Sequence, residues 1–491
     1  MDNNKTLTTN GAVVFNSSNS KVYDFFALGG SQRGASVEEK VKLFEDAYNE
    51  DKDLAVRCLF YLRDVRGGQG ERQLFRDILK HIALNNTNLA KKLLPFVAEY
   101  GRWDDLIILS EVKAVRAEIL DIVKAQFDED MKTDYPSLLG KWMPSESTGK
   151  AAKRKTSPSS ARNRVLCSLL RDKLKLTPRE YRKAVVSLRR KIDIVEDKIR
   201  RGAFSEIDYS KIPSRAGMMY QSLFLKKDYD RYNQFLQKVA KGEAKINTGT
   251  LYPADVAHKA LSQGQREVDV FWKNLKDYCG NSQCSALPIV DTSGSMTWGS
   301  GIPPIEVAVG TGLYLAERCH GPFKNLMMTF SSSSDWIEID PEKNIVDTMR
   351  EITRADWGGS TNIEAAFDKI LNLAIENKLP QEALPNRLII FSDMQFNGSV
   401  STEREYVSTD DSFFDVMKKK YEEAGYTLPN LVFWNCSQRA KDMPMTRADN
   451  VMLVSGQSPS IMENVLQTMF KDGYEVMLDI LNSERYAVIS A

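Results

Sequence analysis

Histidine and cysteine are scarce in this chain, whose 491 residues include three histidines and six cysteines. A structural zinc site usually takes four Cys or His ligands in two close pairs. The only close pair here is Cys279 and Cys284, and no second pair follows it. The sequence therefore argues against a zinc site, and the scattered cysteines favour reduced thiols, as in the cytoplasm.

Long apolar runs are also missing. No stretch reaches the length of about 20 apolar residues that a membrane-spanning helix needs. The N-terminal segment lacks the charged and then apolar pattern of a signal peptide. We therefore expect a cytoplasmic protein that has no membrane partner.

Two common catalytic patterns are absent as well. The glycine-rich segment Arg66–Arg72 lacks the Gly-x4-Gly-Lys-Ser/Thr spacing of a phosphate-binding loop, so it predicts a tight turn between two helices. No Gly-x-Ser-x-Gly motif surrounds Ser293. No histidine or lysine lies close in sequence to the oxygen-rich motifs described below, where a general base would be needed. We expect this protein not to be an enzyme.

The first half of the chain shows helical patterns without strands between them. Ser36 and Glu39 form a predicted capping box, and apolar residues then recur at helical spacing in short segments joined by short turns. Stacked helices of this kind are typical of a HEAT-like α-solenoid. We predict a mostly irregular N-terminal arm over residues 1–35, docked through Val22–Leu28, and a HEAT-like solenoid over residues 36–280.

The second half alternates short apolar strands with helices. Apolar runs such as Ala286–Val290 and Leu388–Phe391 are separated by amphipathic helical patterns. This alternation is typical of a mainly parallel, doubly wound sheet. We predict an α/β domain of Rossmann-like type over residues 285–491, so the whole chain combines an α class with an α/β class.

Oxygen-bearing side chains follow two of these strands and one loop. Asp291, Ser293 and Ser295 come at alternate positions after the first strand, Thr361 lies on a Gly-rich loop before a helix, and Asp393 ends a later strand. Because the carboxyl ends of parallel strands meet at one edge of the sheet, these five side chains are expected to converge. Oxygen ligands with few charges suit Mg²⁺. The alternative is that they are turn-forming and helix-capping residues.

These motifs resemble the metal-ion-dependent adhesion site of von Willebrand factor A domains. The resemblance carries over to Asp291, Ser293, Ser295, Thr361 and Asp393, which match the Asp-x-Ser-x-Ser, Thr and Asp ligands of that site. It implies a von Willebrand factor A-like domain over residues 285–491 that binds Mg²⁺, or Mn²⁺ or Ca²⁺. It also implies a protein partner that supplies an acidic residue to the cation.

Basic residues are concentrated between residues 141 and 215. This stretch has 21 lysines and arginines but 8 aspartates and glutamates, a local charge of +13 in a chain of net charge +1. It holds a basic loop over residues 145–165 and a long helix predicted from Thr177. A basic loop beside a basic helix favours a polyanion-binding surface over a merely solvated helix face. The candidate RNA contacts are Lys150, Lys153, Arg154, Lys155, Arg162, Arg164, Arg182, Lys183, Arg189 and Arg190.

The combination resembles the Ro autoantigen or TROVE group of RNA-binding ring proteins, in particular an uncharacterised branch found in plants and phages. The matching segments are Thr8–Ala12, Asp24–Phe26, Arg66–Arg72, Tyr100–Leu106, Ile207–Arg215 and the cation motifs. The resemblance implies a HEAT-like ring closed by the A domain, with small noncoding or misfolded RNA held in the hole or on a basic rim.

Two functions from different classes follow. The first is an RNA-binding scaffold that takes small or single-stranded RNA by phosphate contacts and base stacking, with no DNA specificity expected. The alternative is a cation-dependent protein–protein interaction module without RNA binding. The basic stretch favours the first function and the intact cation motifs favour the second.

Overall fold

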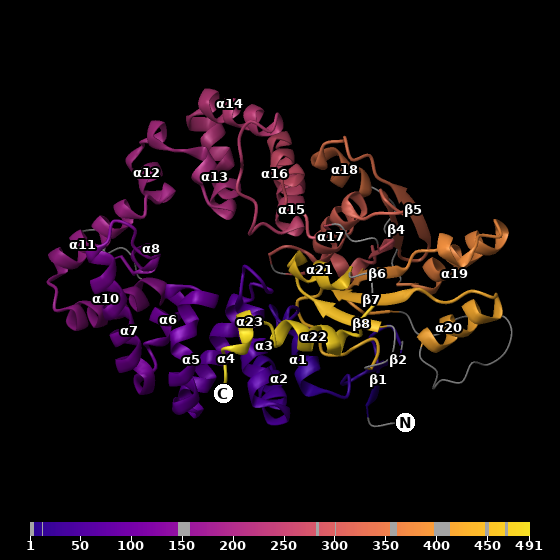
Figure 1. Cartoon of the computed structure of the whole chain (residues 1–491), viewed down its shortest axis with the longest axis horizontal. Helices are drawn as coiled ribbons and strands as arrows, with labels where there is room; N and C mark the ends of the chain where they lie inside the picture. The colour runs from indigo at the N-terminus through magenta and orange to yellow at the C-terminus, as the bar shows by residue number, and fades with distance from the viewer. Residues whose placement is uncertain are drawn as a thin grey trace. The chain divides into compact units, whose positions relative to one another are not determined.

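The computed structural model describes residues 4–11, 13–145, 158–280, 284–299, 301–353, 361–396, 413–446, 451–466 and 470–491. The chain divides into two compact units, and Figure 1 labels most of their helices and strands. The first, here called the α/β unit, comprises Met1–Leu62, Arg66–Glu71 and Thr248–Ala487. The second, the helical unit, comprises Arg63–Val65, Arg72–Asn247 and Val488–Ala491. None of the described helices is long and apolar enough to cross a membrane.

The α/β unit is built on a six-stranded sheet in the order β5-β4-β3-β6-β7-β8. All neighbours are parallel except β4 and β5, which form an antiparallel edge pair. Residues of β3, β6 and β8 are buried throughout, as expected for strands with both faces covered. The strands are β3 (Ala286–Asp291), β4 (Leu326–Phe330), β5 (Ser334–Glu338), β6 (Arg387–Ser392), β7 (Asn430–Asn435) and β8 (Val451–Ser455). The predicted mainly parallel sheet is confirmed.

The strand order places a topological switch between β3 and β6. The chain leaves β3 towards β4 on one side, and β6 leads on to β7 on the other side. The register pairs Val290 with Phe391, so both strands end at the same edge. In open α/β sheets ligands bind at such a switch, outside the carboxyl ends of the strands. The two motif aspartates stand at this point, since Asp291 ends β3 and Asp393 directly follows β6.

Helices from both ends of the chain cover this sheet. Helix α17 packs on β3, β4 and β6, helix α19 packs on β4 and β5, and α1 and α22 pack on β8. The helices of this unit are α1 (Lys21–Gly29), α2 (Val37–Glu50), α3 (Lys52–Arg63), α15 (Pro253–Gln263), α16 (Asp269–Lys273), α17 (Pro304–Arg318), α18 (Ile345–Ile352), α19 (Glu364–Glu376), α20 (Phe413–Glu423), α21 (Met462–Val465), α22 (Gly473–Leu481) and α23 (Glu484–Ala487).

Helix α1 lies against the edge strand β8. Eight of its nine residues are buried, and the Tyr23 hydroxyl accepts a hydrogen bond from the Leu453 N–H at 2.9 Å and donates to its carbonyl at 3.3 Å. Strand β8 pairs with β7 on one side, and on its other side the backbone of Leu453 is hydrogen-bonded by the Tyr23 side chain. The apolar island Val22–Leu28 docks as expected, but the arm is less irregular than predicted. It holds α1 and a two-stranded hairpin, β1 (Lys5–Leu7) and β2 (Val13–Phe15).

The glycine-rich segment Arg66–Arg72 connects helix α3 to α4, as predicted. Within the α/β unit the Gly68 carbonyl accepts from the Ser460 hydroxyl at 3.0 Å, and the Gln69 carbonyl accepts from the Tyr252 hydroxyl at 3.3 Å. Glu71 is buried and pairs with Arg33 at 2.6 Å. These contacts give the segment a structural role.

The helical unit contains no strand among its described residues. Its helices pack mainly on their sequence neighbours, for example α4 on α5 and α13 on α14, as a stacked array requires. They are α4 (Arg72–Asn85), α5 (Thr87–Tyr100), α6 (Trp103–Leu109), α7 (Lys113–Lys132), α8 (Leu139–Trp142), α10 (Pro158–Leu174), α11 (Pro178–Lys191), α12 (Val195–Arg201), α13 (Ser214–Lys227) and α14 (Tyr229–Ala240). The HEAT-like repeat stays a prediction.

The compact units do not follow the predicted ranges 1–35, 36–280 and 285–491. Helices α2 and α15 lie in the range predicted for the solenoid, but α2 packs on α1, and α15 packs on α17 and α18. A Cβ atom on Gly310 of α17 would lie 2.8 Å from the Ala257 methyl of α15, which is too close. The two helices therefore approach each other closely at this glycine. The spacing of apolar residues shows which face of a helix is buried, but it does not show which other helix or strand packs against that face.

A buried ion cluster in the helical unit joins Arg63, Arg76 of helix α4 and Asp105 of helix α6. The Asp105 carboxylate accepts from Arg63 at 2.7 and 3.0 Å and from Arg76 at 2.5 Å. It also caps helix α6 by accepting from the Arg102 N–H at 3.0 Å. Asp105 and Arg63 are 2% and 3% exposed. Removal of one partner from such a cluster leaves an uncompensated buried charge.

We predict that Asp105→Asn lowers the free energy of unfolding by about 3 kcal/mol, because two guanidinium groups lose their buried counter-charge. Urea titration followed by circular dichroism measures this loss. Asp121→Asn is the matched control, since its ion pair with Lys173 is exposed and is expected to contribute less than about 1 kcal/mol. Equal effects of the two substitutions would contradict the prediction.

Candidate functional site

The first candidate site is at the carboxyl edge of the sheet, where Asp291 ends strand β3. Asp291 is fully buried. One of its carboxylate oxygens accepts from the Ser293 N–H at 2.9 Å, and the other accepts from the Ser392 hydroxyl at 2.5 Å. The Ser293 and Ser295 hydroxyls are 3.2 Å apart. The Asp-x-Ser-x-Ser loop therefore turns its oxygens towards one another.

Asp393 belongs to the same cluster. Its carboxylate accepts a hydrogen bond from the Ser295 side chain and one from the Gln395 N–H, the latter at 3.1 Å. Asp291, Ser293, Ser295 and Asp393 are thus linked in one hydrogen-bonded group. The structure brings together four of the five predicted cation ligands.

Thr361 lies at the same edge of the sheet. It is buried, and the N–H of the next residue, Asn362, donates to the Ser331 carbonyl at 2.7 Å. Ser331 directly follows β4, the neighbour of β3, so Thr361 is placed beside the strand ends. The preceding Gly358–Ser360 loop lies outside the described residues.

The two carboxylates are unfavourably placed as free anions. Burial raises the pKa of Asp291 to about 7, with a further contribution from the nearby charge of Asp393, while hydrogen bonds from Ser392 and Ser293 lower it. Burial also raises the pKa of Asp393, and the Ser295 hydrogen bond opposes this. Among the described residues, no lysine or arginine pairs with either group. A divalent cation between them would supply the missing positive charge.

The donors present fit a hard divalent cation. Two carboxylates and three hydroxyls are oxygen ligands with few charges, the set that Mg²⁺ accepts together with water. The described part of the chain holds no group of three or more His, Cys, Asp or Glu side chains arranged for a metal. This excludes the common His- and Cys-rich sites within those residues, but a site with two acidic ligands does not need such a group. A turn-forming role alone does not require two buried carboxylates to lie close together.

Ser392 is a residue of this site that was not among the five predicted ligands. Its hydroxyl donates to Asp291 and accepts from the Met394 N–H at 3.0 Å, so it orients one ligand and fixes the loop that carries the other. The signal was present, because Ser392 is a polar residue that directly follows the apolar run Leu388–Phe391. It immediately precedes Asp393.

The second candidate site is the solvent face of helix α11 in the helical unit. Tyr181, Val185 and Leu188 bury the opposite face. The exposed face lines an open groove with residues at helical spacing: Arg179, Arg182, Lys183, Val186, Ser187, Arg190 and Lys191. Five of these seven residues are basic and none is acidic. We call this surface the α11 basic face.

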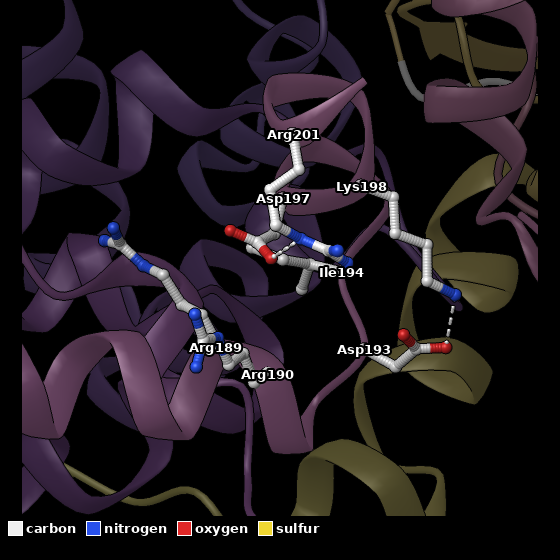
Figure 2. A pocket seen from close by; sticks show the side chains of 7 residues that line it. All are labelled: Arg189, Arg190, Asp193, Ile194, Asp197, Lys198 and Arg201. Atoms are coloured by element: carbon white, nitrogen blue, oxygen red, sulfur yellow. Dashed lines mark hydrogen bonds and ion pairs between the residues drawn. The ribbon is translucent and has the colours of Figure 1, made fainter. Parts of the chain in front are cut away.

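A second hollow near α11 has a different charge balance. This cavity of about 240 Å³ between α11 and α12 is lined by Arg189, Arg190, Asp193, Ile194, Asp197, Lys198 and Arg201 (Figure 2). Lys198 pairs with Asp193 at 2.8 Å and Arg201 pairs with Asp197 at 3.0 Å. Hydrogen bonds from Arg200 and Arg201 hold the pKa of Asp197 below its ordinary value. Two of the four basic residues that line this cavity are therefore paired with an acidic residue within the protein.

Nine of the ten predicted RNA contacts fall into three groups. Arg182, Lys183 and Arg190 lie on the α11 basic face, and Arg179 and Lys191 join them although the sequence analysis did not select them. Arg162 and Arg164 are exposed on α10, where Arg162 pairs with Glu111 at 3.0 Å. Lys150, Lys153, Arg154 and Lys155 lie outside the described residues.

Arg189 differs from the other predicted contacts. Its guanidinium donates to the Gly140 and Met143 carbonyls at 3.0 and 2.8 Å and to the Ser145 hydroxyl at 2.8 Å. Burial lowers its pKa. This side chain holds the end of α8 against α11, so its contacts favour a structural role. The long helix predicted from Thr177 is also interrupted: α11 ends at Lys191, and Asp193 has a positive φ of 57°.

We predict that Asp393→Asn raises the free energy of unfolding by about 1 kcal/mol at neutral pH in the presence of a chelator, because it removes one of two buried like charges. The amide oxygen can still accept from the Gln395 N–H. Thermal unfolding in EDTA measures the change. Ser392→Ala is expected to act in the opposite direction, since it removes a hydrogen bond from the Asp291 carboxylate. A destabilised Asp393→Asn protein would contradict the prediction.

Comparisons with known proteins divide the chain close to the predicted start of the α/β domain. Residues 285–485 match the model of a domain of unknown function, DUF7788, and residues 104–283 match another, DUF2828. The uncharacterized protein L728 of Acanthamoeba polyphaga mimivirus is 28% identical over 521 residues, covering 97% of this chain and 87% of that protein. The crystal structure of the Deinococcus radiodurans RO (RSR) protein aligns with 95% of this chain and 100% of its own, at 16% identity and a TM-score of 0.39. At that score the match does not establish a common fold.

Proposed function

We propose that this chain is an RNA-binding scaffold whose helical unit binds single-stranded or small noncoding RNA through the α11 basic face. The observation that carries the proposal is the series of five basic residues on one face of α11 without an acidic residue among them. Helix α11 lies within residues 141–215, the part of the sequence that has a local charge of +13. Because the sequence resembles Ro ring proteins, we expect the bound polyanion to be RNA. We expect no catalytic activity.

Phosphate contacts explain how such a face binds without reading sequence. Arginine and lysine side chains that displace counterions from phosphates give an affinity that falls steeply with salt. The groove also exposes Val186, which is 38% exposed and offers an apolar contact to a base or sugar. Duplex RNA hides its bases, so a single strand gains more from such a mixed surface.

We predict that Arg179→Gln, Lys183→Gln and Arg190→Gln together weaken binding of a single-stranded RNA at least tenfold at physiological salt, uniformly across sequences. Loss of three phosphate contacts flattens the slope of log K against log salt by about 2, since each contact to a single strand contributes about 0.7. Fluorescence anisotropy with a labelled RNA over a series of salt concentrations measures both quantities.

The control variant removes the same charge from paired residues nearby. Arg200→Gln, Arg201→Gln and Lys211→Gln remove three cations that already pair with Asp197, Glu206 or Asp208. We expect a small change in affinity and slope. If both triple variants lose affinity equally, net charge and not the α11 basic face determines binding. If neither does, or if the parent protein binds no RNA, the proposal is wrong.

A second function is supported by the cluster at the sheet edge. We propose that Asp291, Ser293, Ser295, Thr361 and Asp393 hold Mg²⁺, and that a partner protein completes the coordination with a carboxylate. The support is the pair of buried, mutually repelling carboxylates among hydroxyl oxygens. The alternative to RNA binding, a cation-dependent interaction module, rests on this cluster alone.

We predict that Mg²⁺ at tenfold its dissociation constant stabilises the protein by about 1.4 kcal/mol, because a ligand that binds only the native state shifts unfolding by mass action. Thermal unfolding with and without Mg²⁺ measures this effect, and Asp291→Ala is expected to abolish it. Stabilisation that persists in Asp291→Ala would place cation binding elsewhere.

A further inference from the structure

The N-terminal hairpin touches the loop that carries Asp393. The turn between β1 and β2 begins at Thr8, whose side-chain hydroxyl donates to the Phe396 carbonyl at 2.8 Å. The Thr9 N–H donates to the Gln395 side chain at 3.1 Å, and the Asn10 amide donates to the Gln395 carbonyl at 2.7 Å. Three consecutive residues of the turn therefore bind two consecutive residues of the loop, about 385 positions away.

The turn itself has a fixed shape. The Gly11 N–H donates to the Thr8 carbonyl at 3.0 Å, and Gly11 has a φ of 89°, a conformation that residues with a side chain rarely adopt. The second strand of the hairpin is also anchored, because Phe15 and Met443 exchange two backbone hydrogen bonds of 2.8 and 2.9 Å. Met443 lies in the connection that follows β7. The hairpin is thus tied to the loops after two neighbouring strands.

The loop after Asp393 needs such support. Met394 has a φ of 66°, which is uncommon for a residue other than glycine and persists only where the surroundings impose it. On one side, Ser392 and Asp393 accept from the Met394 and Gln395 N–H groups. On the other side, the turn holds the Gln395 and Phe396 carbonyls. Phe396 is 5% exposed and its ring contacts Phe330 and Phe433.

We infer that the Thr8–Gly11 turn is a clasp that positions Asp393 for the divalent cation. Thr8 and Asn10 are positioning residues: they act through the Gln395–Phe396 backbone and do not themselves approach the cation. The inference rests on the proposed cation site. It also gives a role to Thr8–Gly11 of the sequence motif described above, which neither the cation ligands nor the basic face explains.

The clasp has a thermodynamic corollary. If docking of the turn favours cation binding, the cation must favour docking of the turn by the same factor. Cation binding is therefore expected to slow amide hydrogen exchange of the hairpin, although no hairpin residue is a ligand.

The test is a titration of the full-length protein with Mn²⁺, followed by the electron paramagnetic resonance signal of the free ion. The variant Thr8→Val with Asn10→Ala removes both side-chain donors while Thr8→Val keeps the buried volume. We expect its Mn²⁺ dissociation constant to rise about tenfold, which corresponds to about 1.4 kcal/mol. Thr9→Val is the matched control, because its side chain is exposed and only its backbone N–H binds the loop. Asp393→Asn reports loss of a ligand.

The outcomes are separable. If the parent protein does not bind Mn²⁺, the proposed cation site fails and the clasp fails with it. If the parent binds and the double variant binds equally well, the clasp is wrong and the cation site stands. Asn10→Ala alone, at an exposed position, repeats the comparison if the double variant does not fold. Hydrogen exchange of the hairpin in the parent gives a second readout, and rates that Mn²⁺ leaves unchanged would also overturn the clasp.

Discussion

The closeness of Asp291 and Asp393 is the constraint around which the α/β unit is organised. Two carboxylates that are buried next to each other destabilise the fold unless something compensates for their charge. The strand order nevertheless brings β3 and β6 together and ends both at the same edge. Hydroxyls of Ser293, Ser295 and Ser392 surround the pair. An arrangement that stores repulsion in this way is more readily explained by a function than by stability.

The strand ends could be predicted from the sequence because they depend on local patterns. Each apolar run stops at a polar residue, so Asp291 and Asp393 could be assigned to strand ends without knowledge of the fold. Parallel strands then place those ends at one edge. The support around them could not be predicted in the same way. Side chains of the Thr8–Gly11 turn donate to backbone carbonyls of the loop, and one of these contacts spans 388 positions, which no local pattern records.

In the basic stretch of residues 141–215, the number of charges alone does not show which side chains are available to bind RNA. Arg189 and Arg190 are adjacent and chemically identical, and both line the cavity between α11 and α12. Because a helix turns by about 100° per residue, Arg190 also lines the α11 basic face and Arg189 does not. Arg189 meets carbonyls at the end of α8, whereas Arg190 lines the α11 basic face. Charge counting selects both residues equally. The helical periodicity that identifies the buried face of α11 also predicts which basic residues are exposed. Arg179, Lys183 and Arg190 recur at helical spacing on the opposite face.

Helix α1 has a consequence for how the sheet can be studied. Strand β8 is the last strand of the sheet, and such an edge can recruit a strand from another molecule. The Tyr23 hydroxyl hydrogen-bonds to both the N–H and the carbonyl of Leu453, and the rest of α1 packs on β8. A truncated protein that starts at residue 285 would keep every strand of the sheet and all five cation-site residues. It would nevertheless lack this cover, so it is expected to self-associate through β8 and to need the first 62 residues, supplied as a separate peptide, to stay monomeric.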